Sequence, residues 1–453
     1  MNSYIYDIEA FINYFLVIFY NIQTQKFTIF ELNQRHNQLR ELVKFLEQVD
    51  TLIGFNSKRY DDLVLKYILH NDCLVTNKDL YNLTKALIEK DIAPEFRVKY
   101  QDFLNNKYYK NPWRLSIDLM NFYRKISLKG LAVALGHKVI QELPYKPDEP
   151  LTDEMQEKVK AYCFNDVDIT HKVYEEVKPK LKLRKYLEKD LKEEIRALNH
   201  RKKFETLPDS QLAADIMALK YCSLKSIGLY DLVKLRKPDY SKIKIAELIV
   251  DKIEFITQPL KDFLIDLKNR YLEFEEIEIP TFQGDSFSSV KLKKTSEFKI
   301  AVMINGSSYA FGLGGLHSEA SSKVYNSQDD GQIIDVDVVS YYPSLIINHR
   351  IKPDFLGDEW IEIYKDITQE RLLAKKQGDK LKSEALKIII NSLYGNFNYP
   401  YFYAYDPKTQ YTVTLNGQLY LLMLIERLEL AGYKVISANT DGVTFLNRVG
   451  FLA

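Results

Sequence analysis

The chain has 453 residues, and at about 150 residues per domain this length suggests roughly three domains, each with a substantial core. Apolar residues make up 46% of the sequence and charged residues 28%, which is typical of globular packing. The 63 basic and 62 acidic residues leave a net charge of +1, so the chain as a whole does not attract nucleic acid strongly. Basic residues that gather in one place would still attract it.

Neither a membrane span nor a secretory signal is expected. The longest apolar runs, at residues 15–20 and 419–425, are far shorter than the ~20 residues that span a bilayer. Asp7 and Glu9 fit no signal peptide. The three cysteines lie far apart and form no metal-binding pair, which is typical of reduced thiols. The sequence therefore predicts a cytoplasmic protein.

The first 180 residues have the pattern of an α/β domain. Short apolar or alternating segments predict strands, and amphipathic segments predict helices. We expect strands at residues 3–8, 14–20 and 51–55, and helices at 40–49 and 153–177.

The remaining chain contains a basic segment, a region with few signals and a second α/β pattern. Residues 178–203 carry 11 basic and 4 acidic residues, with leucines at helical spacing. We interpret this segment as a solvated helix with one packed face, and contact with a phosphate backbone is the alternative. From about 206 to 294 we expect mainly helices. Beyond 300 we expect a strand at 333–339, helices at 367–376 and 381–394, and a hairpin at 433–445.

Asp7 and Glu9 are two residues apart on the first predicted strand, so both side chains project from the same face. Two carboxylates held in this way repel one another unless a cation lies between them, and Mg²⁺ or Mn²⁺ prefers oxygen ligands. Such acids are common on exposed strands, so the pair alone is weak evidence. Two later segments strengthen it, with Asn56 and Asp61 at a strand-to-helix turn and Tyr162 and Asp166 one helical turn apart. Four acids and a phenol suit two-metal phosphodiester hydrolysis.

In this order, Asp-Ile-Glu, Asn-x-x-x-Tyr-Asp and Tyr-x-x-x-Asp resemble the three motifs of DEDD-type 3′–5′ exonucleases, in the version with tyrosine in the third motif. The resemblance implies these roles: Asp7, Glu9, Asp61 and Asp166 as ligands of two divalent ions, Tyr162 as the residue that holds the attacking water, and Asn56 as a contact of the single-stranded 3′ end. Asp62 and Asp168 are neighbours of the matched acids, and we expect both to be solvated helix residues.

A second set of acids follows residue 330. Asp337 lies near the end of a predicted strand that breaks at Pro343, and exposed backbone N–H groups at such a bend suit a triphosphate. Asp441 lies in a tight turn between two β-prone segments. Two helices joined by a short turn present cations and polar groups at helical spacing: Arg371 and Lys375 on the first, and Lys387, Asn391 and Tyr394 on the second. Without the neighbouring acids, lysine-rich surface helices would be the preferred interpretation.

These segments resemble motifs A, B and C of family B DNA polymerases, namely Asp-x-x-Ser-(Leu/Tyr)-Tyr-Pro-Ser, Lys-x-x-x-Asn-Ser-x-Tyr-Gly and Asp-Thr-Asp. The resemblance implies these roles: Asp337 and Asp441 as ligands of two Mg²⁺ ions; Arg371, Lys375, Lys387 and Asn391 as contacts of the incoming triphosphate; Tyr342 as the residue that rejects a ribose 2′-hydroxyl; Tyr394 as a stacking partner near the new base pair; and Ser340 and Tyr341 as further parts of the nucleotide site. The protein would contribute mainly alignment and charge neutralisation.

The third motif departs from the family pattern, because Ser437, Asn439 and Gly442 replace its usual Tyr, first Asp and Ser. Asp441, the family's metal ligand, is present, so we expect metal binding to survive. The loss of a charge at Asn439 would lower activity. The glycine-rich segment 311–317 partly resembles the template-contacting link of the family, which implies that Gly314 and Gly315 contact DNA. The 50 residues between motifs A and B are too few for the insertion of protein-primed phage polymerases.

The resemblance predicts a phage- or plasmid-like family B chain with an α/β and α+β fold. We expect an RNase H-like exonuclease domain at 1–180, a helical connecting region at 181–299, and an incomplete polymerase palm at 300–453 with a helical-hairpin fingers subdomain at about 366–396. We expect the thumb to be absent. The sequence stops 12 residues after Asp441. We therefore expect a split or truncated polymerase whose second polypeptide carries the remaining palm and thumb.

The expected ligands are primer–template DNA, dNTPs and two Mg²⁺ or Mn²⁺ ions per active site, in the cytoplasm of a host cell if the chain is viral. Two alternatives remain open, and a third, a protein-primed polymerase, is disfavoured by the short spacing between motifs A and B. The chain is an exonuclease with a relic polymerase half, or it is a non-catalytic DNA-binding subunit.

Overall fold

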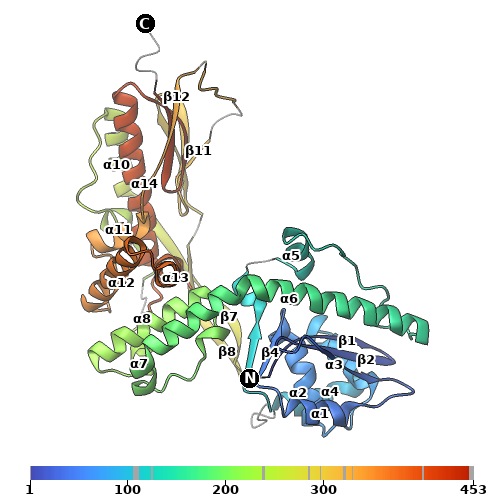
Figure 1. The fold of residues 1–453 in the computed structure, drawn as a ribbon. Coiled ribbons are helices and arrows are strands. Elements are labelled where there is room, and N and C mark those ends of the chain that lie inside the picture. Colours follow the sequence, from blue (N-terminus) through green and yellow to red (C-terminus); the bar gives the residue numbers. More distant parts are fainter. Residues whose placement is uncertain are drawn as a thin grey trace. The chain divides into compact units, whose positions relative to one another are not determined.

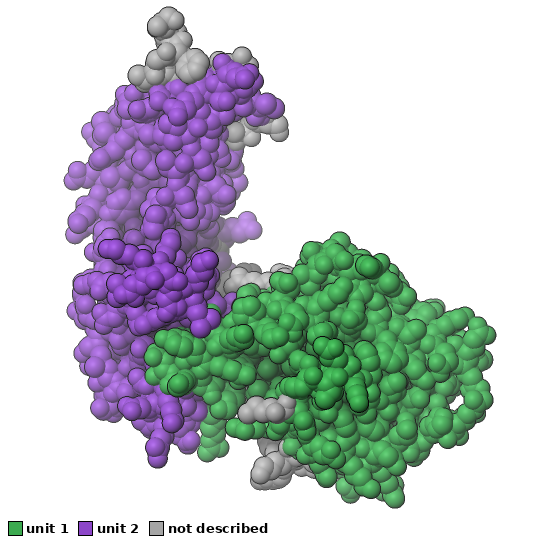
Figure 2. Space-filling view, viewed as in Figure 1, with its two compact units in different colours: residues 1–190, 201–208, 282–287 green, residues 191–200, 209–281, 288–453 purple. Residues whose placement is uncertain are grey.

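The computed structural model describes residues 2–105, 112–123, 126–236, 240–283, 286–295, 297–319, 323–328, 330–399 and 402–447. The chain divides into two compact units (Figure 2). The first comprises Met1–Asp190, Arg201–Pro208 and Phe282–Phe287, and the second comprises Leu191–His200, Asp209–Thr281 and Ser288–Ala453. Among the described residues, no helix has the length and apolar character needed to cross a membrane.

The first unit is built on a five-stranded sheet in the order β3-β2-β1-β4-β5. Its strands are β1 (Ser3–Phe11), β2 (Tyr14–Asn21), β3 (Phe27–Leu32), β4 (Thr51–Gly54) and β5 (Leu115–Asp118). Its helices are α1 (Leu39–Leu46), α2 (Asp61–His70), α3 (Asn77–Ile88), α4 (Arg97–Asn105), α5 (Leu128–Ala134) and α6 (Asp153–Asp190). The first three strands are antiparallel, whereas β4 and β5 run parallel to β1.

Alternation along β1 divides the first unit into two cores. Tyr6 and Ile8 belong to the core on one face of the sheet, which also contains apolar residues of α1, α2 and α3. Ile5 and Phe11 belong to the core on the other face, which contains residues of α5 and α6. Figure 1 shows α6 on one side of the sheet and α1 and α2 on the other. Because side chains alternate along a strand, Asp7 and Glu9 share the face of Ile5, toward α6.

The second unit combines helices with a six-stranded sheet in the order β12-β14-β13-β11-β10-β9. The strands are β9 (Lys299–Ile304), β10 (Ser307–Gly312), β11 (His317–Ser318), β12 (Gln332–Asp337), β13 (Lys434–Asn439) and β14 (Gly442–Asn447). The helices are α7 (Lys192–Ala197), α8 (Asp209–Lys225), α9 (Leu229–Lys234), α10 (Gln258–Asn269), α11 (Tyr341–Asn348), α12 (Glu359–Lys376), α13 (Lys380–Asn396) and α14 (Pro407–Leu430). Apolar residues of α10 and α14 share a core with this sheet.

The structure extends or corrects two expectations from the sequence. The expected helix at 153–177 continues as α6 to Asp190, with Pro179 inside it. Residues 181–299 are not only helical, because they contain β6 (Lys242–Lys244), β7 (Tyr271–Gln283) and β8 (Ser286–Thr295) in a three-stranded sheet. The alternation of Leu272 and Phe274, both buried, with exposed glutamates is the strand signal in this region.

Candidate active sites

The first candidate site gathers three carboxylates from β1 and α6. Asp7 and Glu9 lie on the face of β1 that packs toward α6, and Asp166 projects from that helix. One carboxylate oxygen from each residue lies within 4.8 Å of the other two. Oδ1 of Asp166 is buried and has no hydrogen-bond partner in the described structure. Three converging carboxylates with an unsatisfied oxygen fit a hard divalent cation.

Burial raises the pKa of each acid in this cluster, and repulsion within the cluster adds to it for Asp7 and Glu9. Burial has the largest effect on the pKa of Asp7, and Asp166 adds repulsion. Burial is also the main cause for Glu9, followed by the charges of Asp7 and Asp166. Burial raises the pKa of Asp166 to about 6, although a hydrogen bond from Tyr162 and the charge of Lys129 oppose it. Without a cation these groups therefore retain protons to higher pH than ordinary carboxylic acids.

Asp61 lies beside this cluster but outside the group of three. It is buried at the start of α2, and after burial the charge of Asp7 is the largest cause that raises its pKa. The preceding turn begins at Asn56, which has φ 59° and a buried Oδ1 without a partner in the described structure. Asparagine tolerates this left-handed conformation better than most residues. The turn places Asp61 near Glu9, and the charge of Asp61 raises the pKa of Glu9.

Asp118 holds this turn and was not singled out from the sequence. Its carboxylate, at the end of β5, accepts hydrogen bonds from the backbone N–H of Asn56 at 2.7 Å and of Met120 at 3.0 Å. Because β5 is parallel to β4, their carboxyl ends meet at one edge of the sheet. The sequence signal for Asp118 was an acid that directly follows the short segment Leu-Ser-Ile at 115–117.

Tyr162 lies next to the cluster, as its position one turn before Asp166 predicts. Its hydroxyl forms a hydrogen bond with Asp166, and burial and the neighbouring carboxylates raise its pKa. Lys129 of α5, a second residue that sequence reasoning missed, lies 5.8 Å from the centre of the Tyr162 ring. The positive charge of Lys129 also lowers the pKa of Glu9. The site therefore contains a phenol and a cation beside its acids.

Asp62 and Asp168 differ in their surroundings. Asp62 was expected to be solvated, but it is only 4% exposed and accepts hydrogen bonds from Tyr6 Oη at 2.5 Å and Ser116 Oγ at 2.8 Å. That expectation was wrong because α2 packs against the sheet face that carries Tyr6. Asp168 is exposed, as expected, and its Oδ2 lies 2.9 Å from Nε2 of His137.

The second candidate site lies where β12 pairs with β14. Asp337 is opposite Gly442 in this antiparallel pair, and Asp441 occupies the turn that joins β13 to β14. The backbone N–H of Val338 donates a 3.0 Å hydrogen bond to the carbonyl of Asp441. Partial burial raises the pKa of Asp441, and the charge of Asp337 raises it further. Two acids more than 100 residues apart in sequence therefore act on one another.

Most of the predicted nucleotide-site residues line one cavity of about 490 Å³ with these two acids. From motif A and α11 they are Ser340, Tyr341 and Tyr342, and from the α12–α13 hairpin they are Arg371, Lys387, Asn391 and Tyr394. Lys375 is exposed and does not line the cavity. The cavity thus combines two acids with two cations and an amide.

Specific contacts fix several of these side chains. Arg371 Nη1 donates a 3.2 Å hydrogen bond to Ser340 Oγ, while its buried Nε has no partner in the described structure. The rings of Tyr342 and Tyr394 stack with centroids 4.1 Å apart and an interplanar angle of 16°. The Tyr341 hydroxyl donates to the carbonyl of Gly417. The tyrosines are therefore held by packing and hydrogen bonds, while Arg371 keeps an unused donor.

The glycine-rich segment lies beside the turn that carries Asp441. The backbone N–H of Thr440 donates to the carbonyl of Leu316 at 2.8 Å. A Cβ at Gly315 would lie 2.4 Å from Oγ1 and 3.0 Å from Cα of Thr440, whereas a Cβ at Gly314 would have no neighbour within 4 Å. Gly315 therefore permits close approach of two backbones, which is a structural reason for glycine at this position.

Comparisons with curated proteins and with solved structures both find DNA polymerases. No protein-family model matches the chain. DNA polymerase 1 of Pyrococcus abyssi is 29% identical over 144 residues, which cover 24% of this chain and 19% of that protein. DNA polymerase II of Escherichia coli (strain K12) is 29% identical over 153 residues, which cover 28% of this chain and 19% of that protein. Among solved structures, the family B DNA polymerase of Pyrobaculum calidifontis matches with a TM-score of 0.52 and 13% identity, over 100% of this chain and 54% of that one.

Over about a quarter of its length the chain is similar to curated DNA polymerases, and its fold resembles that of a family B DNA polymerase. This agrees with the resemblance inferred from its motifs. The matched segments span about a fifth of the curated relatives' length and just over half of the structural neighbour. At 13% identity, the structural match concerns the fold alone.

Proposed function

We propose that the second unit is the nucleotidyl-transfer site of a template-directed DNA polymerase and that the first unit is a 3′–5′ proofreading exonuclease. The observation that carries the first part is the meeting of Asp337 and Asp441 in one cavity with Arg371, Lys387 and Asn391. In these terms the first unit is RNase H-like, residues 300–453 are palm, and the α12–α13 hairpin is the fingers.

In the second unit, Asp337 and Asp441 would hold divalent ions, which when bound neutralise phosphate charge and assist in-line attack by a primer 3′-hydroxyl. The free Nε donor of Arg371 and the ammonium of Lys387 face the same cavity and would bind the triphosphate. Asn391 would add a neutral hydrogen bond. Tyr342, stacked on Tyr394, would present a rigid surface to the sugar and exclude a 2′-hydroxyl.

In the first unit, Asp7, Glu9 and Asp166 would hold a divalent ion, with Asp61 close enough to hold a second directly or through water. Bound ions would make a water more acidic and offset the charge of the leaving oxygen. Tyr162 would position the water, since its hydroxyl already lies at Asp166. Asn56 would bind the single-stranded 3′ end through the Oδ1 and Nδ2 atoms of its side chain, of which Oδ1 has no partner in the described structure.

Two assays with matched variants test this proposal. Primer extension with Mg²⁺ and dNTPs should be lost in Asp337→Asn and retained in Asp335→Asn, whose carboxylate lies on the same strand and accepts from Thr444. Degradation of a single-stranded oligonucleotide should be lost in Asp7→Asn and retained in Asp168→Asn. Measurable extension that is equal for wild-type protein and Asp337→Asn would contradict the polymerase part.

The alternatives from the sequence give different results in the same assays. An exonuclease with a relic polymerase half would degrade single strands without extension, with Asp337→Asn indistinguishable from wild type. A non-catalytic DNA-binding subunit would show neither activity. A second polypeptide with the remaining palm and thumb stays a prediction, and its addition should restore extension if the chain alone binds dNTP without extending primers.

A further inference from the structure

A basic pocket of about 300 Å³ in the first unit has no part in the function proposed above. It lies at the amino ends of the parallel strands, where Ser3, Thr51 and Leu115 are register partners. The carboxylate cluster lies farther along β1 and earlier along α6. Asp7 is four residues beyond Ser3, or about 13 Å along a strand. Tyr174 is eight residues beyond Asp166, or about 12 Å along a helix.

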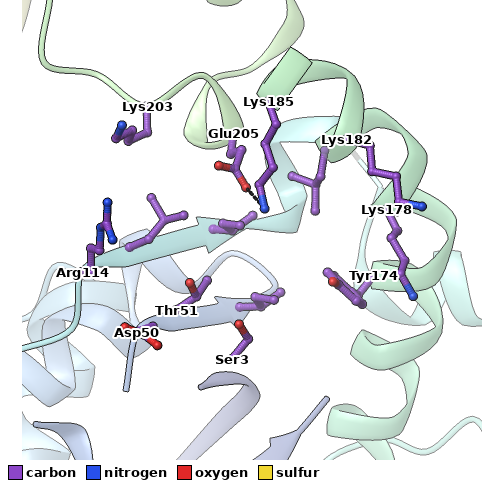
Figure 3. Close-up of a pocket in the computed structure, with 14 residues that line it drawn as sticks. Ser3, Asp50, Thr51, Arg114, Tyr174, Lys178, Lys182, Lys185, Lys203 and Glu205 are labelled. Carbon is purple, nitrogen blue, oxygen red and sulfur yellow. Dashed lines mark ion pairs between the residues drawn. The ribbon is translucent and has the colours of Figure 1, made fainter. Parts of the chain in front are cut away.

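Five cations and two acids line this pocket (Figure 3). The cations are Arg114, Lys178, Lys182, Lys185 and Lys203, and the acids are Asp50 and Glu205. The three lysines of α6 are spaced at i, i+4 and i+7, so they share one face of the helix. They belong to the basic segment for which the sequence left phosphate contact as an alternative.

The cations differ in whether a protein carboxylate already neutralises them. Lys185 pairs with Glu205 at 3.1 Å, Lys203 with Glu188 at 2.7 Å, and Lys178 with Glu175 at 2.9 Å. Within the part of the chain that the structure describes, Arg114 and Lys182 form no ion pair, and both are exposed. The unneutralised positive charge of the pocket therefore lies on these two side chains, where an anion from solution would bind, and it exceeds the single negative charge of Asp50, which also forms no ion pair among the described residues.

The floor of the pocket is apolar and includes one aromatic ring. Ile53, Ile117 and Leu181 are buried residues that line it, and half-buried Tyr174 lies beside them. Lys178 Nζ lies 5.8 Å from the centre of the Tyr174 ring. A cationic rim over an apolar, aromatic floor suits a single nucleic-acid strand, because phosphates contact the cations while an unpaired base covers the ring. A duplex keeps its bases stacked inside and would leave the floor empty.

We propose that this pocket binds the phosphate backbone of a single nucleic-acid strand, with one base against Tyr174, at a site separate from the carboxylate cluster. The choice of nucleic acid among polyanions rests on the proposed function. The ligand is a nucleotide unit, which could come from a strand or from a free mononucleotide. We favour the strand because the lysines that line the pocket extend along α6 over more than the length of one phosphate group.

Fluorescence anisotropy with labelled dT12 in EDTA, over 50 to 200 mM NaCl, tests this inference on the full chain. Each phosphate contact on a single strand contributes about 0.7 to the slope of log K against log salt. Arg114→Ala/Lys182→Ala should therefore weaken binding and reduce the magnitude of the slope by about 1.4. Arg40→Ala/Lys44→Ala, which removes the same charges from exposed positions at α1, should leave the slope unchanged. Equal slopes for the two double variants would overturn the proposal.

Two further measurements separate the base contact and the source of the ligand. Tyr174→Leu should weaken dT12 binding about tenfold with an unchanged salt slope, because stacking carries no charge. Unchanged affinity in this variant would overturn the base contact. Free dTMP should compete with labelled dT12 far more weakly than unlabelled dT12 does. If dTMP competed as well as dT12 at the same concentration, the ligand of the pocket would be a mononucleotide and not a strand. Because binding is measured without metal, a chain without nuclease activity would contradict the proposed function and leave this inference intact.

Discussion

Replacement of Asp166 by asparagine should stabilise the metal-free protein at alkaline pH, although it removes a proposed metal ligand. Burial raises the pKa of Asp166 from 3.8 to about 6. The folded state therefore holds this proton at pH values where the unfolded chain has released it. As pH rises from about 4 through 6, the free energy of unfolding falls, and ionised Asp166 costs about 3 kcal/mol at pH 8.

Burial is the main cause of this shift, and the nearby charge of Glu142 adds to it. Any ionised neighbour in the cluster, whose ligand atoms lie within 4.8 Å, would add repulsion to this cost. The side chain introduced by Asp166→Asn would retain an acceptor for Tyr162 but carry no charge. In EDTA at pH 8 the variant should be more stable than wild type by up to about 3 kcal/mol, and this difference should shrink at pH 5. Mg²⁺ at a hundred times its Kd would stabilise wild type by about 2.7 kcal/mol, and the variant much less.

Urea unfolding followed by tryptophan fluorescence can isolate the first unit. The chain has two tryptophans, and Trp113 lies in the first unit whereas Trp360 lies in the second. In a Trp360→Phe background the signal therefore reports the core that contains Trp113. Glu176→Gln, an exposed position on α6, is the matched control. The reasoning would be refuted if, in EDTA at pH 8, Asp166→Asn were less stable than wild type and the unfolding free energies of the two proteins changed with pH in the same way.

Three further changes have defined outcomes. Gly315→Ala should lower Tm because its Cβ would meet Thr440, and Gly314→Ala should leave Tm unchanged, as thermal melts would reveal. Tyr342→Ala should admit ribonucleotides, and unchanged discrimination in single-nucleotide incorporation would show that another residue excludes the 2′-hydroxyl. Asp118→Asn should lower the unfolding free energy by about 1–3 kcal/mol, because the oxygen that accepts from the backbone N–H of Lys58 at 3.4 Å would become a donor, while the other keeps its bonds from Asn56 and Met120. An unchanged denaturation midpoint would contradict that role.

Local patterns in the sequence predicted three of the five strands and two of the six α-helices named above for the first unit, but not how these elements pair. The strand over Ser3–Phe11 follows from alternation, and so does the placement of Asp7 and Glu9 on one face. Asp62 was misplaced because its burial depends on Tyr6, 56 residues away. Asp118 and Lys129 were missed for the same reason, since each acts on residues from other elements. The expected helix at 153–177 was too short, because buried leucines on α6, including Leu181 and Leu187, continue its packed face beyond Pro179.

In the second unit, family resemblance supplied what periodicity could not. No local pattern predicts that β12 pairs with β14, so the meeting of Asp337 and Asp441 was expected only from the order of the motifs. The same resemblance placed Lys375 in the nucleotide site, yet it does not line the cavity that Arg371 lines. The two residues are four apart on α12, which puts them on one side of the helix but does not fix how far each reaches.

The two acidic sites should respond differently to divalent metal. Asp7 and Glu9 are held against a packed helix, and burial is the main cause that raises their pKa values. Asp337 is exposed and Asp441 lies at a turn, so water already screens most of their repulsion. Mg²⁺ should therefore raise the unfolding midpoint reported by Trp113 more than the one reported by Trp360, measured in single-tryptophan variants. Equal shifts would mean that burial of the first unit's carboxylates does not destabilise the metal-free protein, because solvent or bound protons already neutralise their charge.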